Sequence, residues 1–199
     1  MRLKIVQVGE AVLRAGAREL TREEIRGDEI QRLIRDMRET MHDAPGVGLA
    51  APQVGLPLQL AVIEDREEYL KTIPAEELAE KERMPVPFHV VINPRVEIIG
   101  NETVEFFEGC LSLAGFSALV TRGRQVRVCY LDELGEEKSV VASGWYARIL
   151  QHEIDHLRGT IYIDKMRSRS FTSIENGTRF WKGKSTTEIL KELESASNG

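Results

Sequence analysis

The segment at residues 143–159 (SGWYARILQHEIDHLRG) constrains the fold of this chain more than any other part. Its apolar residues recur at helical spacing, Ser143 suits an N-cap, and Gly159 stands just past the end, so the pattern predicts a helix. His152 and His156 are four residues apart, which places their imidazoles one turn apart on the same side of that helix. Such a pair can bind one metal ion.

Glu153 follows His152 directly and completes the spacing H-E-x-x-H. In this pattern the glutamate stands beside the metal and can take a proton from water. The alternative is a pair of histidines chosen for packing. We favour metal binding, because the chain has only four histidines and this pair shares a helix face with Trp145 and Ile149.

A catalytic metal needs a third protein ligand. The longer peptidase motif would place a histidine at position 162, where this chain has Tyr162. Glu175 could serve as a downstream carboxylate ligand, but it lies in a polar segment without clear helical support. Cys110 is the better candidate, because Gly109 permits a turn that could aim the thiolate at the helix. For Cys129, within an alternating strand pattern, we expect a small buried hydrophobe.

The remaining segments predict a mixture of helices and strands. Residues 21–41 carry apolar side chains at three- and four-residue steps and predict an amphipathic helix. A Gly-rich loop at 46–55 leads into a buried strand, and the charged, Pro-punctuated stretch 67–87 predicts a surface excursion. Strands are expected within 89–99, 102–112 and 124–142, the last with a turn around Gly135, and we expect an irregular tail after about residue 175 that could end in a short helix.

Composition narrows the classes of protein that remain. A chain of 199 residues with 42% hydrophobic residues predicts a single domain over residues 1–199. The net charge of −5 argues against broad electrostatic capture of nucleic acid. No apolar run is long enough to cross a bilayer, and two cysteines exclude a disulfide framework, so we expect a cytoplasmic protein.

Three sequence blocks carry a resemblance to a known family. They are GVGLAAPQVG at 46–55, EGCLS at 108–112 and QHEIDHL at 151–157, in the order typical of peptide deformylases. The similarity extends from about IVQVGEAVLR to KMRSRSFT and is closer to the branch found in mitochondria, plastids and some bacteria. Ala114 and Ser117 replace a Pro and an Arg found in many bacterial members, which bears on contacts beyond the substrate methionine.

The resemblance implies an α+β fold in which mixed or antiparallel sheets pack around a central helix that carries the H-E-x-x-H motif. It implies removal of the formyl group from the N-terminal methionine of newly synthesised polypeptides. The implied cofactor is one divalent ion, Fe²⁺ as the usual metal, with Zn²⁺, Ni²⁺ or Co²⁺ able to substitute. The implied ligands are Cys110, His152 and His156.

The other implied site residues surround this group. Glu153 acts as general base and then general acid, and the side chain of Gln53 with the backbone N–H of Leu111 donates to the oxyanion. Phe106 is a further candidate for the pocket wall, and Glu108 and Arg122 are expected to form an ion pair at its rim. The substrate pocket is expected to include Gly46, Val47, Gly48, Glu108, Trp145 and Ile149.

The expected partners follow from the same resemblance: nascent formylated peptides and a transient contact with the ribosome, without nucleic-acid specificity, in a monomer or a homodimer. An organelle matrix is the alternative compartment. Two other functions are weighed. A peptidase would cleave backbone amides and take its third ligand from downstream. A non-catalytic, metal-stabilised binding module would close the site with a fourth ligand from Cys129, His42 or His89.

Overall fold

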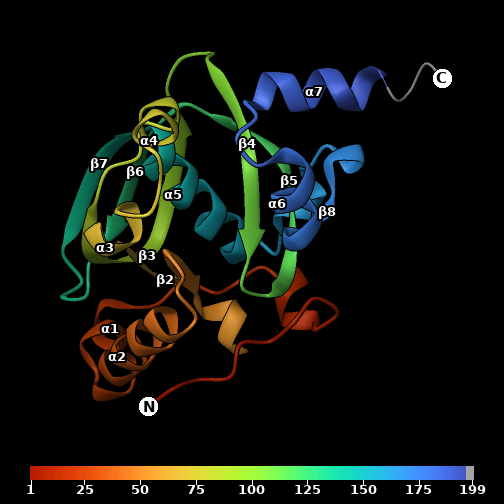
Figure 1. The fold of residues 1–199 in the computed structure, drawn as a ribbon. Helices are drawn as coiled ribbons and strands as arrows, with labels where there is room; N and C mark the ends of the chain where they lie inside the picture. Colours follow the sequence, from red (N-terminus) through yellow and green to blue (C-terminus); the bar gives the residue numbers. More distant parts are fainter. Residues whose placement is uncertain (196–199) are drawn as a thin grey trace.

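The computed structural model describes residues 1–195 and has an α+β fold with two antiparallel sheets. Helix α5 (Gly144–Leu157) lies between the two sheets and contacts strands of both (Figure 1). Eleven of its residues are buried, which is why its sequence is apolar on more than one face. The expected arrangement of sheets around a central histidine-bearing helix is therefore confirmed.

The larger sheet has five strands in the order β1-β2-β3-β6-β7, all antiparallel to their neighbours. In β6 the side chains alternate, so Val126 and Val128 enter the core while Arg127 and Cys129 face outward. The expectation that Cys129 is a small buried hydrophobe is wrong, because its place in this alternation exposes it. The strands are β1 (Gly48–Ala50), β2 (Leu60–Asp65), β3 (Val86–Ile98), β6 (Gln125–Leu131) and β7 (Glu137–Ser143).

The smaller sheet has three strands in the order β4-β5-β8, with bounds Thr103–Cys110, Leu113–Gly123 and Thr172–Ser173. Its pairing is also antiparallel, and the register of β4 against β5 shifts between Gly109 and Cys110. Such an irregularity re-aims the side chain that follows it. The turn expected at Gly109 thus takes the form of a register shift that ends β4 at Cys110.

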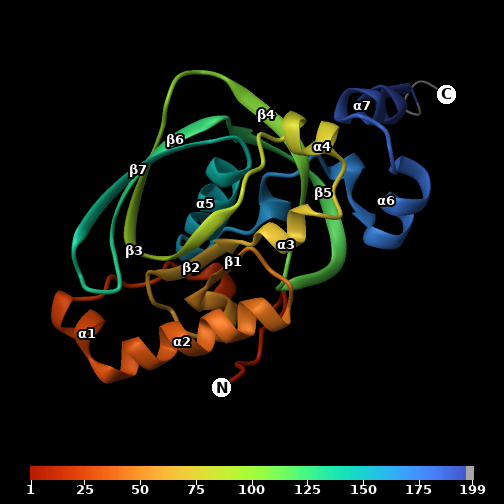
Figure 2. The same ribbon diagram turned by 60° about the vertical axis from the view of Figure 1, so that its left-hand side comes forward.

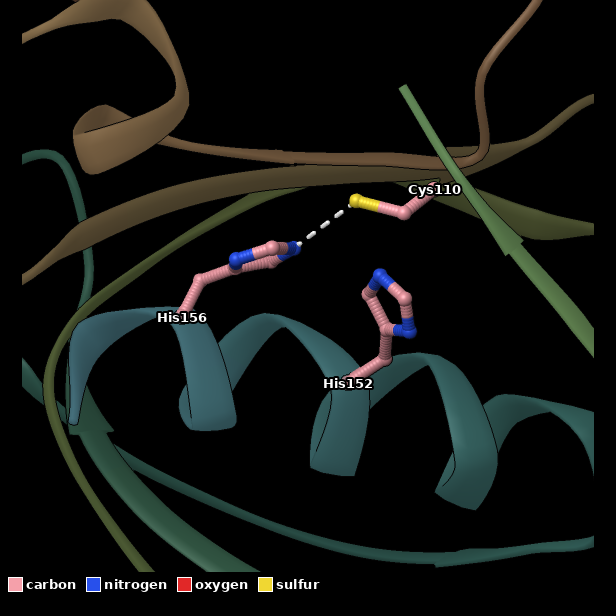
Figure 3. Close-up of side chains that lie close together, drawn as sticks. All are labelled: Cys110, His152 and His156. Carbon is pink, nitrogen blue, oxygen red and sulfur yellow. Dashed lines mark hydrogen bonds between the residues drawn. The ribbon is translucent and has the colours of Figure 1, made fainter. Parts of the chain in front are cut away.

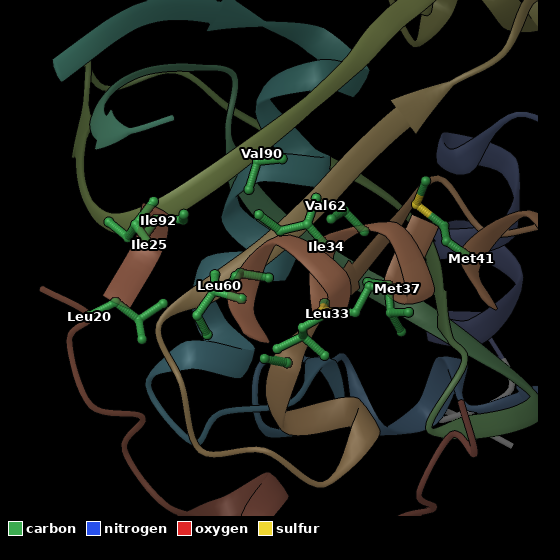
Figure 4. Packing of buried hydrophobic residues seen from close by; sticks show 13 residues of the cluster. Leu20, Ile25, Leu33, Ile34, Met37, Met41, Leu60, Val62, Val90 and Ile92 are labelled. Carbon is green, nitrogen blue, oxygen red and sulfur yellow. The ribbon is translucent and has the colours of Figure 1, made fainter. Parts of the chain in front are cut away.

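The predicted helix at 21–41 is two helices, α1 (Arg22–Arg26) and α2 (Asp28–Asp43). The chain is extended at Gly27, with φ −70° and ψ 149°, which interrupts the helical hydrogen bonding. Thr21 and Glu24 form a capping box that starts α1. The buried face of α2 packs against β1 and β2, as expected from its periodicity (Figures 2 and 4), through Ile30, Leu33, Ile34, Met37 and Met41.

Two segments reach the surface near β4. The excursion at 67–87 contains α3 (Glu67–Leu70) and α4 (Ala75–Glu80). The tail expected to be irregular contains α6 (Ile174–Trp181) as well as α7 (Thr186–Ser195), and the last four residues of that prediction, 196–199, lie outside the described chain. Ser173 starts α6 by accepting a hydrogen bond from the Asn176 N–H. Short 3-10 helices cover Ala11–Arg14, Ala51–Val54, Tyr162–Asp164 and Ser168–Ser170.

The ends of α5 match the sequence pattern in part. Ser143 is its N-cap, but the side chain makes no capping hydrogen bond. Gly159 has φ +73°, and a Cβ there would lie 2.7 Å from the backbone of Arg14, so this position requires glycine. Among residues 1–195, no helix is both long enough and apolar enough to span a bilayer.

Candidate metal centre

Two histidines of α5 and one cysteine at the end of β4 come together in the structure. Both imidazoles project from α5 toward Cys110 (Figure 3), and their ring centroids are 5.0 Å apart. The Cys110 Sγ lies 3.3 Å from His156 Nε2. One ligand atom from each of Cys110, His152 and His156 lies within 4.8 Å of the others, so this group could hold a metal ion.

Glu108 determines how His152 is oriented. The His152 Nδ1–H donates to Glu108 Oε2 at 2.9 Å, which leaves Nε2 free to act as a ligand. Burial alone would raise the pKa of Glu108, but hydrogen bonds from Arg122 and His152 and their charges hold that pKa well below its usual range. Arg148 is a third residue that donates to the Glu108 carboxylate, at 2.6 Å. Glu108 is therefore ionised, and its carboxylate positions the His152 ring.

This geometry differs from the expected ion pair at the pocket rim. Glu108 and Arg122 do pair, with Arg122 Nε 2.8 Å and Nη2 2.9 Å from the carboxylate oxygens. Both are almost fully buried, however, and Arg122 also donates to Asp155 behind the histidines. The pair therefore lies inside the protein and not at the rim. It links β4, which carries Glu108, to β5, which carries Arg122, and to α5, which carries His152 and Asp155.

His156 is buried, and its Nδ1 has no hydrogen-bond partner among the residues that the structure describes. Burial, and then the charge of His152, lowers the pKa of His156 well below its ordinary value. The ring is therefore neutral, which is the form that binds a metal ion.

Glu153 follows His152 on α5 and lies against Gly48 of β1. Its Oε2 is buried and lacks a partner within residues 1–195, and burial raises the pKa of Glu153 to about 7. A Cβ at position 48 would lie 2.2 Å from Glu153 Oε1, so the carboxylate occupies space that only Gly48 leaves open.

Gln53 also reaches this group. Its Oε1 accepts a hydrogen bond from the Ala50 N–H at 2.9 Å, which turns the side-chain NH₂ toward the cavity. That nitrogen lies 3.4 Å from Cys110 Sγ and 3.4 Å from Ser112 Oγ. Leu111 is held through its carbonyl, which accepts a hydrogen bond from Gln7 Nε2.

A cavity of about 410 Å³ lies against this group and is lined by Gln53, Glu108, Cys110, Leu111, His152 and Glu153. Of the expected pocket residues, Gly46, Val47, Gly48, Glu108, Trp145 and Ile149 contribute to its wall, whereas Phe106 lines a neighbouring groove instead. Arg83, Phe116, Arg148 and Ile174 also line it and were not expected. Arg148 could have been found, because it stands four residues before His152 on the same helix face.

The alternative ligands lie elsewhere in the described chain. Glu175 is exposed on α6. His42 pairs with Glu64 at 2.5 Å, and His89 accepts a hydrogen bond from Tyr146 at 3.0 Å. These side chains and Cys129 are not part of the metal-binding group, which argues against the downstream ligand of a peptidase and against a site closed by a fourth protein ligand.

An H-E-x-x-H helix between two antiparallel sheets, with a cysteine brought to it by a neighbouring strand, defines a class of α+β protein built around a metal site. Within that class, the chain belongs to the polypeptide deformylase family, whose model matches residues 2–171. The expected family is confirmed.

Particular relatives are similar over most of this chain. Peptide deformylase 1A, chloroplastic, of Solanum lycopersicum is 49% identical, covering 86% of this chain and 62% of the relative. Peptide deformylase, mitochondrial, of Homo sapiens is 42% identical, covering 85% and 70%. The crystal structure of peptide deformylase from Ehrlichia chaffeensis superposes with a TM-score of 0.71 at 37% identity, covering 83% and 88%. The chain thus spans less than two thirds of the tomato relative.

Proposed function

We propose that this protein hydrolyses the formyl group from the N-terminal methionine of newly made polypeptides and releases formate. The observation that carries the proposal is a group of three metal-ligand atoms at the wall of one cavity, which Cys110 and His152 line together with a buried carboxylate and an amide donor. Membership of the deformylase family supports the same reaction.

The donor set fits a divalent metal ion. Glu108 keeps His152 Nε2 available, His156 is buried in its neutral form, and the Cys110 thiol lies within 3.4 Å of an amide N–H that can stabilise a thiolate. An ion held there would supply Lewis-acid chemistry, polarising the formyl carbonyl and lowering the pKa of water. We propose Fe²⁺, with Zn²⁺, Ni²⁺ or Co²⁺ as substitutes, since one thiolate and two imidazoles suit several divalent ions.

Glu153 would move the proton. Its unpartnered Oε2 at the cavity wall is placed to accept a proton from water as the water oxygen bonds to the formyl carbon. When the C–N bond breaks, the same carboxyl returns that proton to the departing amine nitrogen. A buried carboxylate without a competing protein partner can perform both tasks.

Gln53 and Leu111 would stabilise the negative charge that develops on the formyl oxygen. The Gln53 amide already points into the cavity because its other end is fixed by the Ala50 N–H. Fixed donors of this kind lower the barrier without reorganising during the reaction. Leu111 follows Cys110, which places its backbone N–H next to the metal group.

The cavity walls suit a methionine side chain. Val47, Trp145 and Ile149 provide apolar surface. Gly46 and Gly48 let this wall pack closely on the catalytic residues, since a Cβ on Gly46 would lie 2.9 Å from Leu111 Cδ1 and one on Gly48 would lie 2.2 Å from Glu153 Oε1. We further propose that residues 1–199 act as one catalytic domain and meet nascent chains near the ribosome, in the cytoplasm or in an organelle matrix.

The test is formate release from a formyl-Met-Ala-Ser peptide by protein loaded anaerobically with Fe²⁺ or Ni²⁺. Metal-dependent release that chelation abolishes is expected. If the loaded protein cleaved the Met-Ala bond and left the formyl group in place, the peptidase would replace this proposal.

A further inference from the structure

A groove of about 690 Å³ lies beside the cavity of the metal centre, between α4 and the helices α6 and α7. Figures 1 and 2 both show α4 and α7 at the same end of the molecule, near β4. The groove has an apolar floor that includes Phe106, Phe107, Trp181 and Ile189. The rings of Phe107 and Trp181 are 5.3 Å apart, and Ile189 is 4% exposed, so α6 and α7 are anchored here by packing.

The groove adjoins the cavity. Ile174 lines both. Lys81 of the groove lies 5.1 Å above the ring of Trp145, which lines the cavity. Arg148 of the cavity likewise lies 5.2 Å above the ring of Phe106, which lines the groove. A chain that leaves the cavity on this side enters the groove directly.

Most of a polypeptide substrate has to lie outside the cavity. Only its formylated first residue reacts, and the rest of the chain continues outward at about 3.3 Å per residue when extended. An adjoining groove with an apolar floor can bind that part of the chain by burying its side chains.

One wall of the groove is acidic. Glu76 and Glu80 are exposed, both line the groove, and their spacing of four residues places them on one face of α4. Neither has a hydrogen bond or ion pair within the described chain, whereas Glu77 between them is paired with Lys81 at 2.5 Å. Lys81, Lys182 and Lys184 also line the groove, but Lys81 is paired with Glu77, and Lys184 is paired with Glu192 at 2.6 Å. The two unpaired carboxylates on α4 therefore outweigh the single remaining lysine and favour basic side chains.

We propose that this groove binds the part of the substrate polypeptide that follows the residues held in the cavity, and that it favours basic side chains there. The inference rests on the proposed deformylation. Much of the groove wall comes from Ile174 onward, beyond residues 2–171 that match the family model, whereas its acidic side comes from α4.

The test compares three substrates by kcat/KM: formyl-Met-Ala-Ser, and the same tripeptide extended by five residues that are rich in either Lys or Glu. The wild-type protein should prefer the Lys-rich peptide by about two- to fivefold, the range for exposed ion pairs, and salt should reduce the difference. The double variant Glu76→Lys/Glu80→Lys should reverse the order and leave the tripeptide unaffected.

The matched control is Glu23→Lys/Glu29→Lys, which makes the same change in net charge at exposed helical positions outside the groove. It should keep the wild-type order of substrates. If the control reversed the order as strongly as the groove variant, or if neither long peptide were preferred, the groove would not bind substrate. Failure to hydrolyse the tripeptide would instead refute the deformylase proposal.

Binding can be measured without turnover by calorimetry on metal-loaded Glu153→Gln protein. Glu76→Lys/Glu80→Lys should weaken binding of the Lys-rich peptide by about the same two- to fivefold. Trp181→Ala should weaken the binding of both long peptides and leave the affinity for the tripeptide unchanged. Equal affinities in all variants would overturn the proposal.

Discussion

Glu153 occupies the space in which the side chain of residue 48 would lie. A Cβ on Gly48 would be 2.2 Å from Glu153 Oε1 and 2.6 Å from its Cδ, well inside van der Waals contact. The strand β1 therefore approaches α5 closely at this point, and the position of the carboxylate depends on the missing side chain. This contact joins the Gly-rich block to the H-E-x-x-H helix.

Gly48→Ala is expected to displace Glu153 and reduce kcat far more than it reduces metal content. Overpacking of this kind costs about 1–3 kcal/mol of unfolding free energy. Thermal melts, metal analysis and formate release measure the three effects. Gly16→Ala is the control, because a Cβ there meets no atom within 4 Å. Wild-type turnover in Gly48→Ala would show that the carboxylate is not held by this contact.

Cys110→Ala is expected to lose most bound metal, because it removes the only sulfur ligand of the group. Metal stoichiometry after dialysis is the measurement. Glu175→Ala should retain full stoichiometry, since Glu175 is exposed on α6. If Cys110→Ala kept its metal and Glu175→Ala lost it, Glu175 would be the third ligand.

Glu153→Gln should keep its metal and lose activity by about 10²–10⁴-fold, the usual contribution of a general acid or base. The amide fills the same space beside Gly48 but cannot accept and return a proton. Formate release by protein of verified metal content tests this. Near-normal turnover would remove Glu153 from the proton transfer.

Gln53→Ala should reduce kcat by about 10²–10³-fold with a smaller change in KM, because charge on the formyl oxygen is largest in the transition state. Gln53 is buried and also bonds the Ala50 N–H, so unfolding free energy and metal content are measured alongside. A variant that keeps its metal and melting temperature but changes only KM would assign Gln53 to substrate positioning.

His89 should make folding sensitive to acid. Burial lowers the pKa of His89 below its ordinary 6.5, while its ring accepts a hydrogen bond from Tyr146 and donates one to the Pro87 carbonyl. Below pH 6.5 the unfolded chain then binds more protons than the folded one, so the unfolding free energy falls as the pH drops through 6.5 toward the folded pKa. His89→Gln should show a shallower decrease between pH 7.5 and about 5 in denaturant titrations. Parallel curves for the two proteins would contradict this role.

Local patterns predicted much of the fold. The periodicity of residues 30–41 identified the buried face of α2, and the alternation in β6 identified a strand. The break at Gly27 and the exposure of Cys129 were missed, because a helix boundary and the choice of buried face depend on what packs against the segment. Helix α6 was missed because its sequence is polar, and its Trp181 becomes a packing residue only beside Phe107.

Residue types and their spacing along the chain identify the residues that could carry the chemistry. His152 and His156 share a helix face because the α-helix repeats every 3.6 residues, and Glu153 is fixed next to them by the covalent chain. The packing of distant segments brings Cys110, rather than Glu175, to these histidines and lets Glu108 position His152. It also places α4 and α6 on two sides of one groove beside the cavity. These relationships join residues far apart in the chain, so they follow from how β4, α5 and the C-terminal helices pack against one another.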